Sequence, residues 1–115
     1  MNAVQTLPRP VERQEDQPAG AKPRKQPPYA VVVLNDEEHT FEYVIETLMK
    51  VFGYPHEKSF ALTLQVHNAG KAIVWSGSRE VAELKRDQIR SAGPDFYAGT
   101  KVDFPLGVTI EPLPG

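Results

Sequence analysis

Acidic and amide side chains gather at one point of this 115-residue chain. Asn35 and Asp36 follow an apolar run, and Glu37 and Glu38 come next. Paired carboxylates are the usual groups of general acid–base catalysis. A helix is expected to begin just after them, however, and the helix dipole alone favours negative charge there. Ordinary turn chemistry also accounts for Asn35 and Asp36, so an acid–base pair is the less favoured interpretation.

The three histidines are His39, His56 and His67, and their spacing forms neither a HExxH pair nor another close metal-binding pattern. The chain also lacks a GxSxG elbow, a Walker-type phosphate loop and any cysteine nucleophile. His67 falls on the apolar stripe of an expected helix, where a core histidine bonded to a carbonyl is the simpler explanation. We therefore expect no catalysis, no metal and no cofactor.

Charge and hydropathy narrow the class of protein further. The formal charge of −2 provides no basic surface for nucleic acid. No apolar run reaches the roughly 18–20 residues that cross a bilayer, and the first residues lack the apolar segment of a secretory signal. We expect a monomeric cytoplasmic protein that binds neither nucleic acid nor membrane.

The chain divides into three parts by composition. Residues 1–28 hold six of the eleven prolines and no sustained apolar pattern, so a disordered N-terminal extension is expected there. Residues 29–112 are expected to form the folded core domain, and residues 113–115 a short tail. From composition alone, the extension is as well explained by a solubilising role as by a specific function.

Hydrophobic periodicity predicts six elements in the core domain. The β-branched run 29–34 predicts a buried strand, and a stripe from Phe41 to Phe52 predicts a helix over 40–52 that Thr40 caps and Gly53 ends. A second helix is expected to open at Pro55, to bury Phe60, Leu64 and His67 on one face, and to stop at Gly70. The remaining expected elements are a strand over 71–75, a helix from its cap Ser78 to Gly93-Pro94, a loop over 94–105 and a strand over 107–111.

The expected order of elements is thus β-α-α-β-α-β. Three amphipathic helices need an apolar surface, and a small sheet with one apolar face needs cover. We therefore predict an α+β fold in two layers, with a three-stranded antiparallel sheet and three helices on one face. The acidic cluster would lie at the rim of such a core, which indicates a small binding module.

Three spaced motifs resemble the ClpS family of protease adaptors. They are the strand-to-helix segment from Val33 to Val44, the run Val66-His67-Asn68-Ala69-Gly70-Lys71-Ala72, which resembles the family's VHxxGKA signature, and the third helix around residues 80–85. The resemblance spans Tyr29 to about Ala92, with a weaker match at 106–111. It implies a non-catalytic adaptor that binds proteins by a destabilising, bulky hydrophobic N-terminal residue and delivers them to a ClpA- or ClpC-type unfoldase for degradation by ClpP.

The resemblance also implies the roles of individual residues. Asn35, Asp36 and His67 would hold the substrate's α-ammonium group, which carries a positive charge and three donors and therefore suits a carboxylate beside neutral acceptors. Glu37 and His39 would lie on the rim. The hydrophobic pocket for the first side chain is assigned to Phe41, Thr63, Val66 and Leu106. The N-terminal domain of the unfoldase would contact Glu80 and Lys85, and the N-terminal extension would help to hand over the substrate.

Departures from the family's pattern leave an alternative open. Glu37 stands where a second Asp is usual, and His39 and Phe41 stand where Thr and Met are common. Thr63 stands where a larger Met narrows the pocket, and the loop over 94–103 is longer than is typical of the family. The alternative is a ClpS-like paralogue with an altered pocket that regulates the unfoldase or reads other N-termini. An interaction domain like that of the ribosomal stalk protein, which shares this small fold, is a third hypothesis, and the two motifs at 35–36 and 67–72 argue against it.

Overall fold

The structure is a computed structural model that describes residues 26–114. Most of the expected extension over 1–28, and the last residue of the expected tail over 113–115, lie outside the described residues. The six elements are β1 (Tyr29–Leu34), α1 (Phe41–Phe52), α2 (His56–Ala69), β2 (Lys71–Gly77), α3 (Arg79–Arg90) and β3 (Val108–Pro112). Their order is the predicted one.

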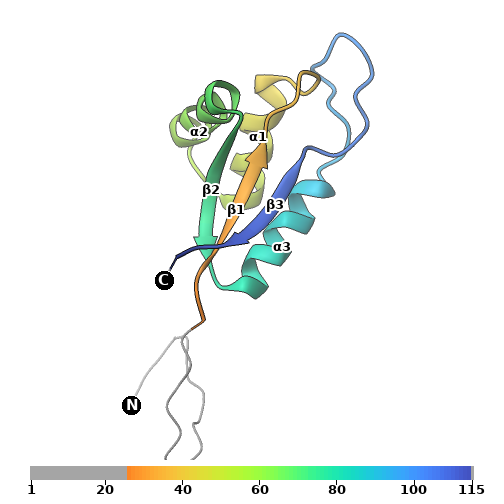
Figure 1. The fold of residues 1–115 in the computed structure, drawn as a ribbon. Helices are drawn as coiled ribbons and strands as arrows, with labels where there is room; N and C mark the ends of the chain where they lie inside the picture. Colours follow the sequence, from red (N-terminus) through yellow and green to blue (C-terminus); the bar gives the residue numbers. More distant parts are fainter. Residues whose placement is uncertain (1–25, 115) are drawn as a thin grey trace, which may run out of the picture.

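The sheet is antiparallel with strand order β2-β1-β3, so the first strand is the central one (Figure 1). Its side chains from Ala30 to Val33 are all buried. Val31 and Val33 pack with side chains from all three helices in one core cluster, among them Leu48 of α1, Val66 of α2 and Ile89 of α3. The α+β fold with three helices on a three-stranded antiparallel sheet is therefore confirmed.

The helix ends follow the capping residues that the sequence contains. Thr40 accepts a hydrogen bond from the N–H of Tyr43 at the start of α1, and Ser78 accepts one from Val81 at the start of α3. Gly53 and Gly70 end α1 and α2 at φ +71° and +86°, a region that only glycine adopts without steric cost. These predicted boundaries are confirmed, except that Pro55 precedes α2 as its N-cap rather than opening it.

The buried face of α2 differs from the predicted one. Phe60 and Leu64 are 44% and 39% exposed, and His67 is exposed as well, so it is not a core histidine. The buried side chains are Ser59, Thr63 and Val66, one position away around the helix. The prediction was wrong because it ranked positions by hydropathy, whereas α2 packs against α1 and the sheet edge through its smaller side chains.

Helix α3 is shorter than expected and buries less. It ends at Arg90 rather than at Gly93-Pro94, and only Ala82 and Ile89 among its residues are buried. No helix among residues 26–114 is both long and apolar enough to cross a bilayer.

The segment 94–107 between α3 and β3 is anchored at both of its ends. Asp95 pairs with Val102 in an antiparallel bridge, and both residues are buried. The segment extends beyond the strand ends on the side where β1 stops and α1 begins (Figure 1). It therefore lies next to the acidic cluster that the sequence singles out.

Candidate binding site at the end of strand β1

Sheet pairing brings the acidic turn and the end of α2 together. Leu34, the last residue of β1, is paired with Lys71, the first residue of β2. The chain enters β2 directly from α2, so the C-terminus of that helix lies at the same end of the sheet. The N–H of Asn35 donates to the carbonyl of Gly70 at 2.9 Å and fixes this approach.

A pocket of about 180 Å³ lies between the turn, α1 and α2. Its lining residues are Asn35, Asp36, Glu37, His39, Thr40, Phe41, Val44, Thr63, Val66 and His67. The structure thus brings together every residue that the sequence proposed for the N-terminus site, its rim and its hydrophobic pocket, apart from one. Two further lining residues were not proposed for the site: Thr40, which was expected only as a helix cap, and Val44.

The exception is Leu106. It is 2% exposed and packs in the core cluster, and it is not among the residues that line the pocket. Its neighbour Gly107 accepts a hydrogen bond from the N–H of Leu34, which places residue 106 beneath the end of β1. Leu106 therefore lies in the core and does not line this pocket in the structure, and its assignment to the hydrophobic pocket stays a prediction.

The Asp36 carboxylate is held by its own turn. Its Oδ1 accepts hydrogen bonds from the backbone N–H groups of Glu38 at 2.8 Å and His39 at 2.7 Å, and its Oδ2 lies 2.7 Å from Nδ1 of His39. The acidic residues 36–38 therefore belong to a separate turn before α1. In the first turn of α1 itself, the only acidic side chain is that of Glu42. Partial burial alone would raise the pKa of Asp36, but the hydrogen bonds and the nearby His39 outweigh it and lower the pKa below its usual value of 3.8.

This geometry leaves Asp36 able to take one more donor. A carboxylate offers about four lone-pair sites, and the turn and the His39 ring occupy three of them. The remaining site is on Oδ2, and the side chain keeps 26% of its surface exposed. Asp36 is thus an ionised, fixed acceptor with room for one charge-assisted hydrogen bond.

The lowered pKa of Asp36 predicts how the stability depends on pH. A carboxyl whose pKa is lower in the folded chain stabilises the fold above its unfolded pKa, and this contribution is lost as the pH falls through the folded value. We expect Asp36→Asn to be less stable than the wild type at pH 7, and this difference to shrink below about pH 4. Urea unfolding of both proteins at pH 7, 4 and 3 measures it, and a difference that stays constant over this range would contradict the assignment.

His39 connects the turn to the segment 94–107. Its ring lies 2.7 Å from Asp36 on one side and 3.0 Å from the carbonyl oxygen of Phe104 on the other, and its side chain is only 2% exposed. The ring also packs edge-on against Phe104. Carboxylate and carbonyl oxygens only accept, so the ring satisfies both when each nitrogen carries a proton. The proposed rim residue is therefore a buried cross-link rather than a free side chain.

The other side of the pocket is mainly apolar. Phe41 and His67 meet edge to face, with ring centroids 5.1 Å apart, and Val44 and Val66 are buried behind them. A closed apolar cavity of roughly 150 Å³ holds a benzene ring, so the volume of this pocket suits one large side chain. A carboxylate at the mouth and an apolar interior are what a group with a charged head and a hydrophobic body requires.

Asp95 is a residue that sequence reasoning missed. Its carboxylate is buried and accepts hydrogen bonds from the N–H of Thr40 at 2.7 Å, from the Thr40 hydroxyl at 3.0 Å and from the N–H of Tyr97 at 2.9 Å. It therefore ties the segment 94–107 to Thr40, the N-cap of α1. No local pattern marks it, because its main partner is distant in the sequence.

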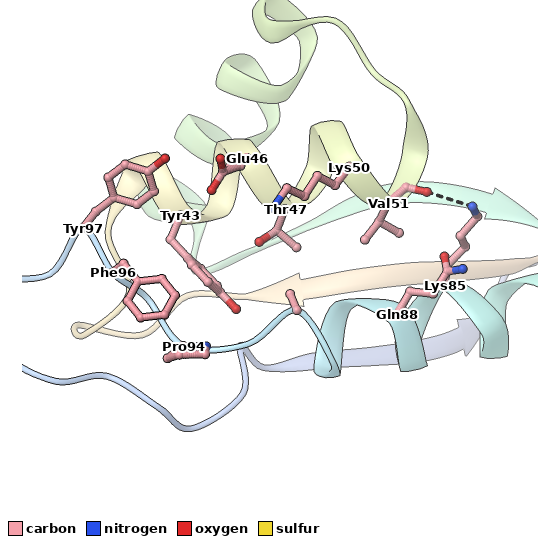
Figure 2. Close-up of a pocket in the computed structure, with 11 residues that line it drawn as sticks. Tyr43, Glu46, Thr47, Lys50, Val51, Lys85, Gln88, Pro94, Phe96 and Tyr97 are labelled. Atoms are coloured by element: carbon pink, nitrogen blue, oxygen red, sulfur yellow. Dashed lines mark hydrogen bonds between the residues drawn. The ribbon is translucent and has the colours of Figure 1, made fainter.

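A larger hollow of about 340 Å³ lies on the other side of α1, and Figure 2 shows its lining. Phe96 and Tyr97 lie along it beside Tyr43 and Glu46. Lys50 and Lys85 also line it, and their positive charges would repel an ammonium group. This hollow is therefore a poorer site for a charged N-terminus than the pocket at Asp36.

The two residues proposed for the unfoldase contact lie apart. Glu80 is exposed and lines a shallow hollow with Pro27 and Pro28, whereas Lys85 lines the hollow of Figure 2. Lys85 donates to the carbonyl of Val51 at 2.8 Å and lies over the ring of Phe52. It therefore holds the last turn of α1 in addition to any role on the surface.

Comparison with known proteins gives one consistent family. Residues 24–107 match the family model described as "ATP-dependent Clp protease adaptor protein ClpS". A protein named ATP-dependent Clp protease adapter protein ClpS from Nostoc sp. is 48% identical over 68 residues, which cover 58% of this chain and 70% of that protein. Another of that name from Nocardia farcinica is 38% identical over 93 residues, covering 81% and 83%.

A solved structure has the same fold. It is Agrobacterium tumefaciens ClpS2 bound to L-phenylalaninamide, with a TM-score of 0.63 and 29% identity, and the match covers 77% of this chain and all of that one. The relatives are adaptors by name, so this chain is similar to proteins that serve a protease without being one.

Proposed function

This chain belongs to the ClpS family of adaptors of the ATP-dependent Clp protease, and from that premise we propose that its pocket binds the free N-terminus of proteins that begin with a bulky hydrophobic residue. The protein is an adaptor and not an enzyme. Its task is then to recognise a substrate and deliver it to the Clp unfoldase, which supplies the work of unfolding.

One observation carries this proposal: an ionised carboxylate with one free acceptor site stands at the mouth of a cavity of the right size for a single ring. Asn35 and His67 line the same pocket as Asp36 and can add hydrogen bonds to the amine. L-Phenylalaninamide, the ligand of the related structure, carries both groups that this arrangement suits, a free α-amine and an aromatic side chain.

The expected affinity follows from the same groups. Burial of a large apolar side chain contributes about 1.5–3 kcal/mol. Each hydrogen bond to a charged group adds about 1.5–3 kcal/mol before the cost of desolvation. Such contributions, reduced by the cost of association, correspond to micromolar dissociation constants.

We further propose that the partner is the N-terminal domain of a ClpA- or ClpC-type unfoldase in the cytoplasm. Exposed Glu80 and the surface around Lys85 are the proposed contacts. Because Lys85 also holds the end of α1, substitution of Glu80 is the cleaner test of this surface. The residues before Gln26 are proposed to assist delivery, and the adaptor is proposed to act as a monomer.

The decisive experiment compares two peptides that differ only at the amine. A fluorescent peptide beginning with Phe should bind the full chain with micromolar affinity, and the same peptide with an acetylated N-terminus should bind at least tenfold more weakly. Acetylation removes the charge and two donors while keeping the side chain. Fluorescence anisotropy measures both titrations, and equal binding of the two peptides would refute the proposal.

A second candidate is the paralogue with an altered pocket, which the hydroxyl group of Thr63 inside the pocket favours. It retains the unfoldase surface but reads other N-termini. The same titration, extended to every first residue, separates the two candidates: a profile without bulky hydrophobic residues supports the second.

A further inference from the structure

Within the proposed function, the pocket contains a feature that distinguishes between bulky side chains. We infer that the pocket prefers a first residue whose side chain ends in a hydroxyl group, tyrosine over phenylalanine, and that Thr63 is the residue that sets this preference. The inference depends on the proposed function, since it concerns the side chain that enters the same pocket.

One face of α2 leads from the mouth of the pocket inward. His67, Thr63 and Ser59 are spaced four residues apart, so they lie above one another along the helix. Burial increases along this row: His67 is exposed, Thr63 is 2% exposed and Ser59 is fully buried. The first two line the pocket, whereas Ser59 does not and lies one helical turn further toward the N-terminus of α2. A side chain whose amine lies near His67 can therefore meet one hydroxyl-bearing residue of this row, Thr63.

The hydrogen bond that the Thr63 hydroxyl makes within α2 determines which kind of guest group this hydroxyl can bind. The Thr63 hydroxyl donates its proton to the carbonyl of Ser59 at 2.8 Å. Its oxygen keeps lone pairs but has no second proton, so Thr63 can act toward a guest only as an acceptor. A phenol O–H is a donor, and the phenyl ring of Phe has none. Among the walls at this depth, Val44 and Val66 offer carbon only.

Ser59, one helical turn from Thr63, carries a second buried hydroxyl group. Its hydroxyl is buried and has no hydrogen-bond partner among the described residues. A buried hydroxyl without a partner is costly, and such groups in folded proteins usually serve a purpose. Packing alone would be satisfied by alanine at this position. Ser59 does not line the pocket, so the hydroxyl offered to a guest side chain is that of Thr63 alone.

The expected ratio of the two peptide affinities follows from how strongly binding sites distinguish ligands with and without a hydroxyl group. A site built to hydrogen-bond a hydroxyl rejects the analogue that lacks it more strongly than an apolar site rejects an added hydroxyl. The pocket here is small and not fully closed, so we expect a moderate effect. Peptides that begin with Tyr should bind about five- to tenfold more tightly than otherwise identical peptides that begin with Phe.

The test uses Thr63→Val, which keeps the branched shape and removes the hydroxyl. Both peptides are titrated against the wild type and this variant by fluorescence anisotropy. The wild type should show the five- to tenfold preference, and T63V should reduce it to less than twofold, mainly by weakening the Tyr peptide. Thr63→Ser keeps the hydroxyl and should keep the preference. Thr47→Val is the matched control, because Thr47 is equally buried but lines the hollow on the other side of α1.

The outcomes separate this inference from the function on which it rests. Equal binding of the Tyr and Phe peptides by the wild type, with both lost on acetylation, would overturn the inference and leave the N-terminus site intact. A preference that survives in T63V would overturn the role of Thr63. If neither peptide binds, the proposed function fails, and the inference fails with it.

Discussion

Replacement of Asp36 by alanine should weaken binding of a Phe-initiated peptide by more than tenfold. The carboxylate is ionised, fixed by two backbone N–H groups and one ring nitrogen, and has one acceptor site left at the mouth of the pocket. A charge-assisted hydrogen bond at a partly buried site is worth about 1.5–3 kcal/mol, and each 1.4 kcal/mol changes an affinity tenfold. Anisotropy titration of the wild type and D36A with one peptide measures the loss.

The matched control for this experiment is Glu38→Ala. Glu38 is exposed, lies two residues away and does not line the pocket, yet its replacement changes the net charge by the same amount. E38A should bind the peptide within twofold of the wild type. Equal losses of affinity in D36A and E38A would mean that only the overall negative charge attracts the peptide. An unchanged affinity of D36A would show that the Asp36 carboxylate is not part of the binding site. Circular dichroism of each variant confirms that the fold is retained.

The resemblance to the ClpS family placed Asn35, Asp36 and His67 in one site, and strand pairing explains why the fold brings them together. Once the run 29–34 and the run that begins at Lys71 are assigned to one antiparallel sheet, the end of the first strand must face the start of the second. The helix before Lys71 then ends beside Asn35 and Asp36, as the pairing of Leu34 with Lys71 shows. Cap residues act within one turn of their own helix. Their positions can therefore be predicted from the local sequence, and Thr40, Gly53 and Ser78 were predicted correctly.

The buried face of α2 could not be predicted in the same way. Hydropathy favours Phe60 and Leu64, but the helix buries Ser59 and Thr63, whose size suits a close approach to α1. Which side chains α2 buries depends on the shape of the surface that it packs against. Hydrophobic periodicity carries no information about that shape. For the same reason the shape and volume of the pocket appear only in the structure.

The contacts of the segment 94–107 were also beyond sequence reasoning. Turn-forming residues predict a loop but not the residues that fasten it. The resemblance assigned Leu106 to the pocket, but only the structure shows that this residue packs in the core cluster. Asp95 and His39 fasten the segment through partners more than 50 residues away.

Replacement of Asp95 by alanine should lower the free energy of unfolding by about 2–4 kcal/mol. Several hydrogen bonds to a buried carboxylate are lost, and each is worth about 1.5–3 kcal/mol before water or neighbouring groups take the place of the carboxylate. The N–H of Thr40 would lose its acceptor at the N-terminus of α1, and the N–H of Tyr97 would lose its acceptor in the loop. Urea unfolding followed by circular dichroism measures the change. Asp103→Ala is the control within the same segment: Asp103 is exposed and lies 3.6 Å from Lys101, and such a surface pair contributes about 0–1 kcal/mol.

The same replacement also tests whether the segment supports the binding site. Asp95 holds Thr40, which lines the pocket and directly precedes Phe41, so loss of this contact frees the start of α1 from the loop. Under conditions where D95A remains folded, we expect it to bind the Phe peptide about threefold or more weakly than D103A does, because the mouth of the pocket is no longer fixed before the guest arrives. A destabilised D95A with unchanged affinity would show that the segment stabilises the fold alone. Unchanged stability would show that the carboxylate does not hold Thr40 in solution.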